Sequence, residues 1–325
     1  MADVNLPSRL SEENRGQLFL VTALAVAVML VSLALVLNTA IYTENIATRT
    51  TDTQLDEAAS SQRAAVTATG TILDAENRDG GGTDEIDSRF DSAVGNWSST
   101  ASTLEASNGF SVDVSYTGTN TPGLRIYQDD PSRNFTDNTP SSDWQVVNDG
   151  RVRGVWFNLS RADLATTESD AFEVRIKDES SDDDVEVKMY TDGTNVTVTV
   201  RNDTGLVGTC DVEPPTGDSL VVDVGNKVVG NQYCAPLEVA HDELDGDVDV
   251  HFDNPENATG TYELYATDDD DLDDLDDLLD GGEFASPGSG WPVRQDAIYD
   301  ANVTFTFHAS GATVVKEIRI APGEL

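Results

Sequence analysis

The stretch Leu18–Leu37, LFLVTALAVAVMLVSLALVL, decides the fold predicted for this 325-residue chain. No charged residue falls within it, and only Thr22 and Ser32 are polar. Its twenty residues, if helical, span about 30 Å, which is the hydrocarbon thickness of a bilayer. A core helix of a soluble domain is usually shorter and carries a polar face. The sequence therefore predicts a transmembrane helix at residues 17–37, preceded by a cytoplasmic leader at residues 1–16.

The residues around this stretch separate three kinds of membrane signal. A cleaved secretory signal has a shorter apolar region and a small-residue cleavage site, and Asn38–Ile41 is a poor one. A plain signal anchor fits the length of the stretch. Arg15-Gly16-Gln17, directly before an uncharged helix, resembles the class III (prepilin-type) signal of archaeal type IV pilin-like proteins. In that family a membrane peptidase cuts between Gly and Gln, so the resemblance implies cleavage between Gly16 and Gln17.

The resemblance continues to Arg49, and Asn38–Asn45 is similar to a set of uncharacterised pilin-like membrane proteins of halophilic archaea. It implies a subunit of a cell-surface filament or secretion-type assembly. The partners that it implies are membrane lipid, a prepilin peptidase and other pilin-like subunits, including copies of the chain itself. One departure is Val21, five positions after the expected cut, where many bacterial pilins carry an acidic residue that meets a neighbour's N-terminal amine. That contact is unavailable to this chain.

The charge of the chain indicates the medium in which it works. It holds 60 acidic and 19 basic residues, a formal net charge of −41. Self-repulsion of this kind destabilises a compact protein at low salt. In molar salt the Debye length falls to about 3 Å and most of the repulsion is screened. The composition therefore predicts a protein of a halophile, and it argues against a nucleic-acid partner because a phosphate backbone requires a basic surface.

Basic residues, sequons and cysteines agree on one orientation. Arg9 and Arg15 precede the apolar stretch, which favours a cytoplasmic N-terminus. The only two cysteines, Cys210 and Cys234, follow it and predict one disulfide in an oxidising compartment, with two buried thiols as the alternative. We therefore expect a single-pass protein of the cell membrane with an extracellular C-terminal domain. All Asn-x-Ser/Thr sequons also follow the stretch, and the glycosylation candidates are Asn96, Asn134, Asn158, Asn195, Asn202, Asn257 and Asn302.

Between the apolar stretch and residue 110 the pattern is helical and then weak. No Gly or Pro occurs from Gln17 to Thr69, and apolar residues return at helical spacing after residue 54. Residues 38–75 are therefore predicted to form a helical stem, with a partly disordered spacer as the alternative. Residues 76–109 are expected to be a linker that contains a short helix around Glu85–Val94.

From Phe110 onward, apolar and polar residues alternate, which is the period of half-buried strands. About eleven short segments show this pattern, separated by turn residues. Hairpins are expected at Asn148-Asp149-Gly150 and at Thr191–Asn195, because these residues suit positive φ. The predicted fold class is therefore α+β, with a long N-terminal transmembrane helix followed by an antiparallel β-sandwich extracellular domain at residues 110–325.

Two acidic groupings have a metal-binding interpretation. The segment Asp268–Gly282 is rich in carboxylates, which are calcium ligands, but Leu278 falls at a required position of the EF-hand loop. The alternative is a surface helix or loop solvated by salt. Asp249, His251 and Asp253 share one face of a strand, which is either a metal site or the solvent side of an edge strand. For both groupings the solvated interpretation is favoured, so the sequence predicts no metal site.

No residue pattern nominates an active site. Motifs for serine nucleophiles, zinc hydrolysis and phosphate loops are absent from the sequence. We therefore expect a protein that is not an enzyme and has no cofactor. The tryptophans are either sugar-stacking or core residues, namely Trp97, Trp144, Trp156 and Trp291.

Three functions remain open. The favoured one is a pilin-like or pseudopilin subunit that acts by helix packing and surface display. The alternative is a stationary membrane-anchored surface glycoprotein whose β-sandwich binds a glycan or another cell-surface partner. An anchored extracellular hydrolase is the third.

Overall fold

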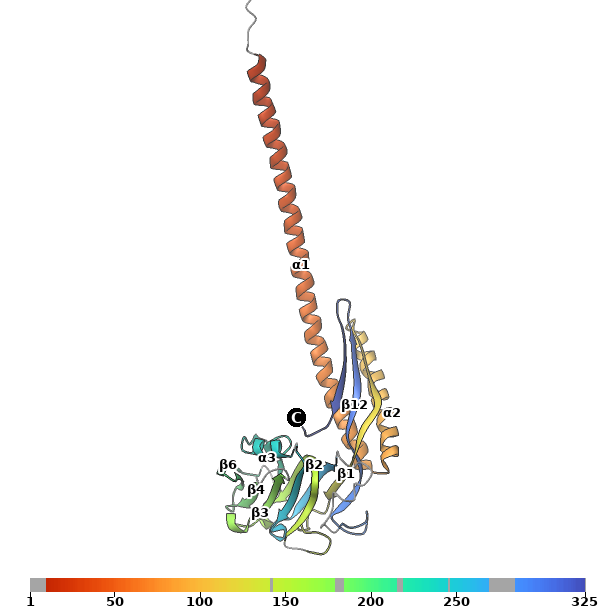
Figure 1. The fold of residues 1–325 in the computed structure, drawn as a ribbon, viewed down its shortest axis with the longest axis vertical. Helices are drawn as coiled ribbons and strands as arrows, with labels where there is room; N and C mark the ends of the chain where they lie inside the picture. Colours follow the sequence, from red (N-terminus) through yellow and green to blue (C-terminus); the bar gives the residue numbers. More distant parts are fainter. Residues whose placement is uncertain are drawn as a thin grey trace, which may run out of the picture. The chain divides into compact units, whose positions relative to one another are not determined.

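A computed structural model describes residues 10–140, 143–178, 184–214, 219–244, 246–268 and 284–324. Its α-helices are α1 (Leu10–Asp79), α2 (Thr83–Ala106) and α3 (Leu237–Glu243), shown with the strands in Figure 1. Short 3₁₀ helices occupy Arg161–Asp163, Glu168–Asp170 and Pro255–Asn257. Contacts divide the chain into two compact units. The first is Met1–Ser60 with Ala309–Thr313, and the second is Ser61–His308 with Val314–Leu325.

In the first unit, the described side chains of α1 before residue 39 are exposed. The large apolar ones among them are Leu24, Val26, Val28, Met29, Leu30, Val31, Leu33, Leu35, Val36 and Leu37. Further along α1, Gln54 is buried and contacts the residues that follow β12 (Val293–His308). Its Nε2 donates to Oγ of Ser310 at 3.0 Å, and its Oε1 accepts from the N–H of Gly311 at 3.2 Å.

The predicted fold class is wrong in two respects, and the first concerns the membrane helix. Among the described residues, no helix is long and apolar enough to cross a membrane. A helix does cover the expected residues, but it is a single element that continues to Asp79.

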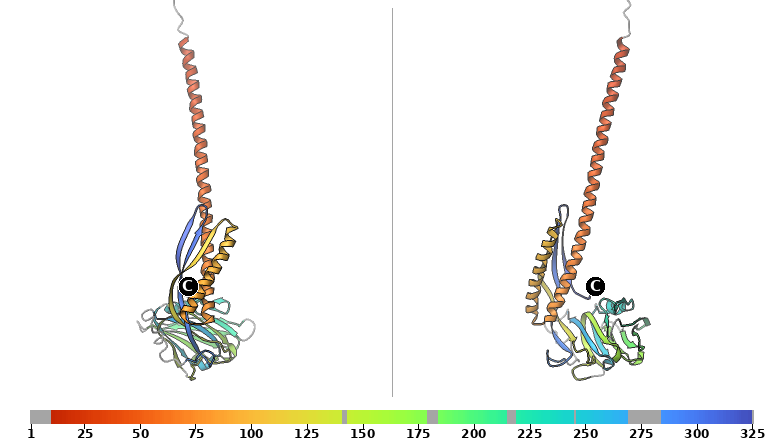
Figure 2. Two further views of the ribbon diagram at one scale, coloured as in Figure 1. Left: turned by 90° about the vertical axis from the view of Figure 1, so that its right-hand side faces the viewer. Right: turned by 180° about the vertical axis from the view of Figure 1, so that it is seen from behind.

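The region predicted as a linker is largely the helix α2. It has 24 residues, and Ile86, Phe90, Val94 and Ser98 are buried at a spacing of four, which places them on one face. This face packs on β1 (Ser111–Gln128), and α2 runs alongside β1 and β12 in Figure 2. The Ser98 hydroxyl accepts from the Val114 N–H at 2.8 Å and so ties the helix to the strand.

The second unit is built on a 13-stranded, mostly antiparallel sheet. Within the described residues, the hydrogen-bonded order is β13-β12-β1-β11-β2-β10-β3-β4-β5-β6, with β7 paired to β2, β8 to β7 and β9 to β8. The bounds not yet given are β2 Asp143–Ser160, β3 Phe172–Asp178, β4 Asp184–Thr191, β5 Val196–Asn202, β6 Gly205–Val212, β7 Ser219–Asp223, β8 Val228–Val229, β9 Gln232–Tyr233, β10 Val248–Asp253, β11 Gly260–Thr267 and β13 Thr313–Ile320.

The second correction is that the described strands form one sheet that continues through β2, where the sequence predicts two stacked sheets. The residues expected as a hairpin at Asn148-Asp149-Gly150 lie inside β2, so that hairpin prediction is wrong. Asp149 does adopt a positive φ of 46°, but its N–H donates to Oδ1 of Asp249 and the strand continues. Residues Asp143–Gly150 of β2 pair with β10, and residues Arg151–Leu159 pair with β11. A bulge within β2 therefore precedes the point where the strand changes its partner.

The hairpin expected at Thr191–Asn195 is confirmed, since it joins the paired strands β4 and β5. Gly193 takes a φ of 92°, and Oδ1 of Asp192 accepts from the N–H groups of Thr194 and Asn195 at 2.7 and 2.6 Å.

An aromatic cluster packs in the core around β2 and its neighbouring strands. The rings of Phe157 and Phe172 lie 5.6 Å apart, and those of Phe252 and Tyr262 lie 5.2 Å apart. Phe135 contacts three of these rings from the loop after β1. All five side chains are almost fully buried and form an aromatic part of the core of the second unit.

Candidate ligand cavity

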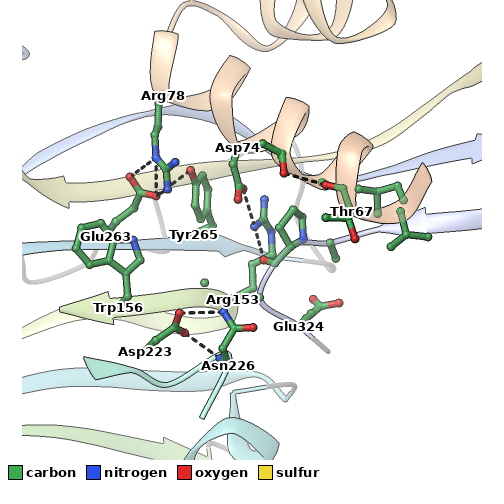
Figure 3. A pocket seen from close by; sticks show the side chains of 18 of the residues that line it. Thr67, Asp74, Arg78, Arg153, Trp156, Asp223, Asn226, Glu263, Tyr265 and Glu324 are labelled. Atoms are coloured by element: carbon green, nitrogen blue, oxygen red, sulfur yellow. Dashed lines mark hydrogen bonds and ion pairs between the residues drawn. The ribbon is translucent and has the colours of Figure 1, made fainter. Parts of the chain in front are cut away.

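A cavity of about 760 Å³ lies in the second unit between the later turns of α1 and the sheet (Figure 3). Its walls come from α1, β2, β7, β11 and the residues at the end of β13. The volume falls within the roughly 300–1,000 Å³ that is typical of small-molecule sites.

Three neighbouring strands each place one side chain in a row along the floor of the cavity. Backbone pairing sets Glu263 of β11 opposite Trp156 of β2, and Trp156 opposite Asp223 of β7. Directly paired residues project from the same face of a sheet. An indole ring therefore lies between two carboxylates, and all three residues line the cavity.

Glu263 is the centre of a buried network of charges. Its side chain is 3% exposed, and it accepts from Nη2 of Arg78 at 2.7 Å and from Nη2 of Arg125 at 2.5 Å. The Tyr265 hydroxyl donates to Oε1 at 3.2 Å. Burial by itself raises the pKa of Glu263, but the hydrogen bonds from Arg78 and the charge of Arg125 outweigh it and hold this pKa below its ordinary value. Glu263 is therefore ionised and joins α1 to β1 and β11.

Arg153 is the second buried charge, and it is held mainly by backbone carbonyls. Its Nε donates to the Tyr299 carbonyl at 2.5 Å and its Nη1 to the Pro322 carbonyl at 2.7 Å. The guanidinium lies 4.3 Å from the centre of the Tyr265 ring. Oδ1 of Asp74 is 3.6 Å from Nη1 of Arg153 and, within the described residues, has no hydrogen-bond partner. Burial, opposed by Arg153, raises the pKa of Asp74.

The other charged groups of the lining are paired at its margin. Asp223 accepts from both the backbone N–H and Nδ2 of Asn226, each at 2.9 Å. Arg319 donates to Oδ2 of Asp300 at 2.7 Å and to the carboxylate of Glu324. The lining thus contains three basic and four acidic side chains, which is close to neutral in a chain with a net charge of −41.

The tryptophans that the sequence left ambiguous have different roles. Trp144 is a core residue whose N–H donates to the Phe135 carbonyl at 2.9 Å. Trp291 packs edge-on against Tyr127, and Trp97 lies on α2. Trp156 lines the cavity, and its indole N–H makes no hydrogen bond within the described part of the chain. Trp156 is therefore the one of the four that faces this cavity.

The Asp249, His251 and Asp253 face does not form a metal site. Across the described ranges, no group of three or more His, Cys, Asp or Glu residues is placed to hold a metal ion. β10 is paired with both β2 and β3, so the prediction of an edge strand is wrong. Asp249 accepts from Gln145 and from the Asp149 N–H, and Asp253 pairs with Arg175 at 2.7 Å. These carboxylates serve pairing within the sheet.

The cysteine prediction is confirmed, and two other predictions fall outside what the structure describes. Cys210 of β6 is joined to Cys234, which follows β9, across a sequence separation of 24. The expected leader-processing residues Arg15, Gly16 and Gln17 lie within α1, but their side chains are outside the described set. Most of the acidic segment, residues 269–283, also lies outside it, so the calcium interpretation stays untested.

The seven sequon asparagines differ in accessibility. Asn96 is exposed on α2, whereas Asn134, Asn158, Asn195, Asn202, Asn257 and Asn302 are half-buried. Two of the half-buried amides are used in the fold, since Nδ2 of Asn134 donates to the Glu256 carbonyl at 2.6 Å and Nδ2 of Asn257 to the Asp170 carbonyl at 2.9 Å. Asn96 is therefore the most open glycosylation candidate.

The sequence interpretation did not identify the charged residues of the cavity, although each leaves a local signal. Glu263 is the single charge of β11, Arg125 lies between apolar residues in the last part of β1, and Arg153 is one of two arginines that flank Val152 in β2. A charge in a buried strand requires a partner, because an unpaired one is costly to desolvate. That signal predicts a buried ion pair but not which residues are partners.

Comparison with known proteins assigns the chain to a family. The profile of a family described as "Family of unknown function (DUF7261)" matches residues 12–189, which is more than half of the chain. The chain belongs to this DUF7261 family. No curated protein and no solved structure matches it. In this DUF7261 member, Arg78, Arg153 and Trp156 of the cavity fall within the matched residues, whereas Asp223 and Glu263 lie after them.

Proposed function

We propose that the chain is a pilin-like subunit that assembles with copies of itself through the apolar part of α1 and displays its β-rich unit on the assembly. The observation that carries the proposal is the exposure of apolar side chains on every face of this part of α1. Val28, Met29, Leu30 and Val31 make one full helical turn and are 58–71% exposed.

A helix that is apolar all round is normally covered on all sides. Burying a Leu, Val or Met side chain of this kind stabilises an assembly by about 1.5–3 kcal/mol. In the described residues of the first unit, Val26–Leu37 has no such cover. The segment therefore has a strong tendency to associate with another apolar surface.

A second copy of the same helix fits this requirement. The segment carries no charge, whereas the chain as a whole has a net charge of −41, so contacts between copies elsewhere are opposed by repulsion. Ala23 and Ala27 stand one turn apart, and small side chains allow two helices to approach closely. Packing of the apolar segments leaves the acidic units on the outside. The resemblance of Arg15-Gly16-Gln17 to a prepilin-type signal agrees with this arrangement.

Assembly is tested by placing one charge in the segment. Leu30→Lys adds a cation where side chains would pack, and Leu104→Lys makes the same change at an exposed leucine of α2. We expect the full chain in molar salt to form regular particles by sedimentation velocity and electron microscopy. Leu30→Lys should shift it to monomers, and Leu104→Lys should not. A monomeric parent protein, irregular aggregates only, or equal behaviour of the two variants would refute the proposal.

A further inference from the structure

We infer that the cavity between α1 and the β11–β2–β7 strands binds a neutral, hydroxyl-rich ligand of the saccharide class, with Trp156 as the surface on which a sugar ring stacks. The inference is independent of assembly through α1. It starts from the row of Glu263, Trp156 and Asp223. Because these residues are paired across three strands, their side chains project from the same face of the sheet.

The indole ring supplies the apolar part of the site. Trp156 is only half-buried and lines a cavity large enough for a small oligosaccharide. The carbon-bound hydrogens on one side of a sugar ring form an apolar patch that fits a flat aromatic face. An aromatic side chain with a free polar N–H suits a ligand that is apolar on one side and polar at its edges.

The polar groups around the ring include both donors and acceptors. The Trp156 N–H is a free donor within the described residues. Arg78 uses Nε and Nη2 on Glu263, and in the described part of the chain Nη1 has no protein partner. Asp223 is held by two bonds from Asn226 and keeps lone pairs that can accept. A hydroxyl group both donates and accepts, so a polyol satisfies this mixture better than a pure acceptor or a pure donor.

Charge balance argues against an ionic ligand. The lining holds Arg78, Arg153 and Arg319 against four carboxylates, and the charges directly behind it, Arg125 and Asp300, cancel each other, so the surroundings differ from neutrality by one charge. An ion entering this cavity loses hydration and meets only this small net charge in return. A neutral ligand does not carry that cost. The cavity therefore differs from the rest of this acidic chain in a way that favours an uncharged ligand.

Binding is tested on the full chain with four probes: glucose, galactose, mannose and N-acetylglucosamine. Saturation-transfer NMR reports which sugar protons contact the protein, and it is run at low and molar potassium chloride. We expect a signal for at least one sugar, strongest on ring C–H protons and unchanged by salt. Trp156→Ala should weaken binding at least tenfold, whereas Trp97→Ala, a tryptophan outside the cavity, should leave it unchanged.

Two further variants keep the test decisive if Trp156→Ala does not fold. Trp156→Phe retains a stacking ring and loses the N–H, and Asp223→Asn retains the shape and removes the charge. Each should weaken binding relative to the parent protein, whereas Trp97→Ala should not. Absence of signal for all four sugars, or equal loss in Trp156→Ala and Trp97→Ala, would overturn the inference. A signal from N-acetyl-lysine amide that disappears in molar salt would assign the cavity to a cationic ligand instead. The Leu30→Lys variant should bind sugar as the parent protein does, because Leu30 is not among the residues that line the cavity.

Discussion

Replacing Glu263 by Gln removes one negative charge from the centre of the buried network with almost no change of shape. The side chain of Arg125 is 9% exposed and would be left as a buried cation without its counter-ion. Removing one partner of a buried pair costs about 3–5 kcal/mol. Arg78 is 49% exposed, so solvent screens its ion pair with Glu263. Loss of that pair adds only about 0–1 kcal/mol to the destabilisation. We therefore expect Glu263→Gln to destabilise the protein by about 3–5 kcal/mol.

A matched control is the exposed pair between Glu168 and Arg201. Their closest atoms are 2.6 Å apart and the side chains are 38% and 36% exposed. Glu168→Gln should therefore cost only about 0–1 kcal/mol. The assay is urea unfolding of the full chain in molar potassium chloride, followed by circular dichroism. Equal losses of stability in the two variants would show that the burial of Glu263 does not determine how much Glu263→Gln destabilises the protein.

The same network gives a pH dependence with a defined sign. The pKa of Glu263 is lower in the folded protein than in the unfolded chain, so its contribution to stability is complete above the ordinary Glu value of about 4.3. The contribution is lost as the pH falls through the lowered folded pKa. The difference in unfolding free energy between the parent protein and Glu263→Gln should therefore be constant at neutral pH and shrink on acidification. A difference that grows at low pH would contradict the assignment of Glu263 as ionised.

Two further outcomes follow from the sequence. The melting temperature of the full chain should rise steeply between about 0.1 M and molar potassium chloride. The Debye length then falls from about 10 Å to about 3 Å, which screens the repulsion among the charges that give the net charge of −41. A flat or falling melting temperature would mean that the acidity serves a specific cation site. N-terminal sequencing of protein from its natural source should begin at Gln17, and a mature chain that keeps Gly16 would remove the prepilin-type support for the proposed assembly.

What could be predicted from the sequence was local. The β4–β5 hairpin was predictable because Asp192 and Gly193 form a turn whose hydrogen bonds lie within five residues. The disulfide was predictable because only one pairing of Cys210 and Cys234 exists. The antiparallel strands followed from alternation of apolar and polar residues, which the burial of β3 and β4 repeats residue by residue.

What could not be predicted depends on partners far along the chain. Asp149 has a positive φ in a hairpin turn and in a bulge alike, and only the carboxylate of Asp249 decides for the bulge. α2 has a glycine and several serines in its middle, so its propensity is weak and burial of Phe90 and Val94 stabilises it. The row of Glu263, Trp156 and Asp223 in the cavity depends on the register of three paired strands. The residues next to Trp156 and Asp223 in the sequence do not indicate that register.

The disulfide has a consequence for the end of the sheet. Among the described strands, β6 is the last in the hydrogen-bonded order and pairs only with β5, so hydrogen bonds alone would allow it to fray. Cys210 of β6 is linked to Cys234, and the Cys234 N–H donates to the Lys227 carbonyl at 2.8 Å. Closing a loop of this length lowers the conformational entropy of the unfolded chain, which stabilises the folded state by about 3 kcal/mol. Peeling β6 from the sheet must therefore also pull on the segment at Lys227, so an outward force on this edge is shared between two distant parts of the sheet.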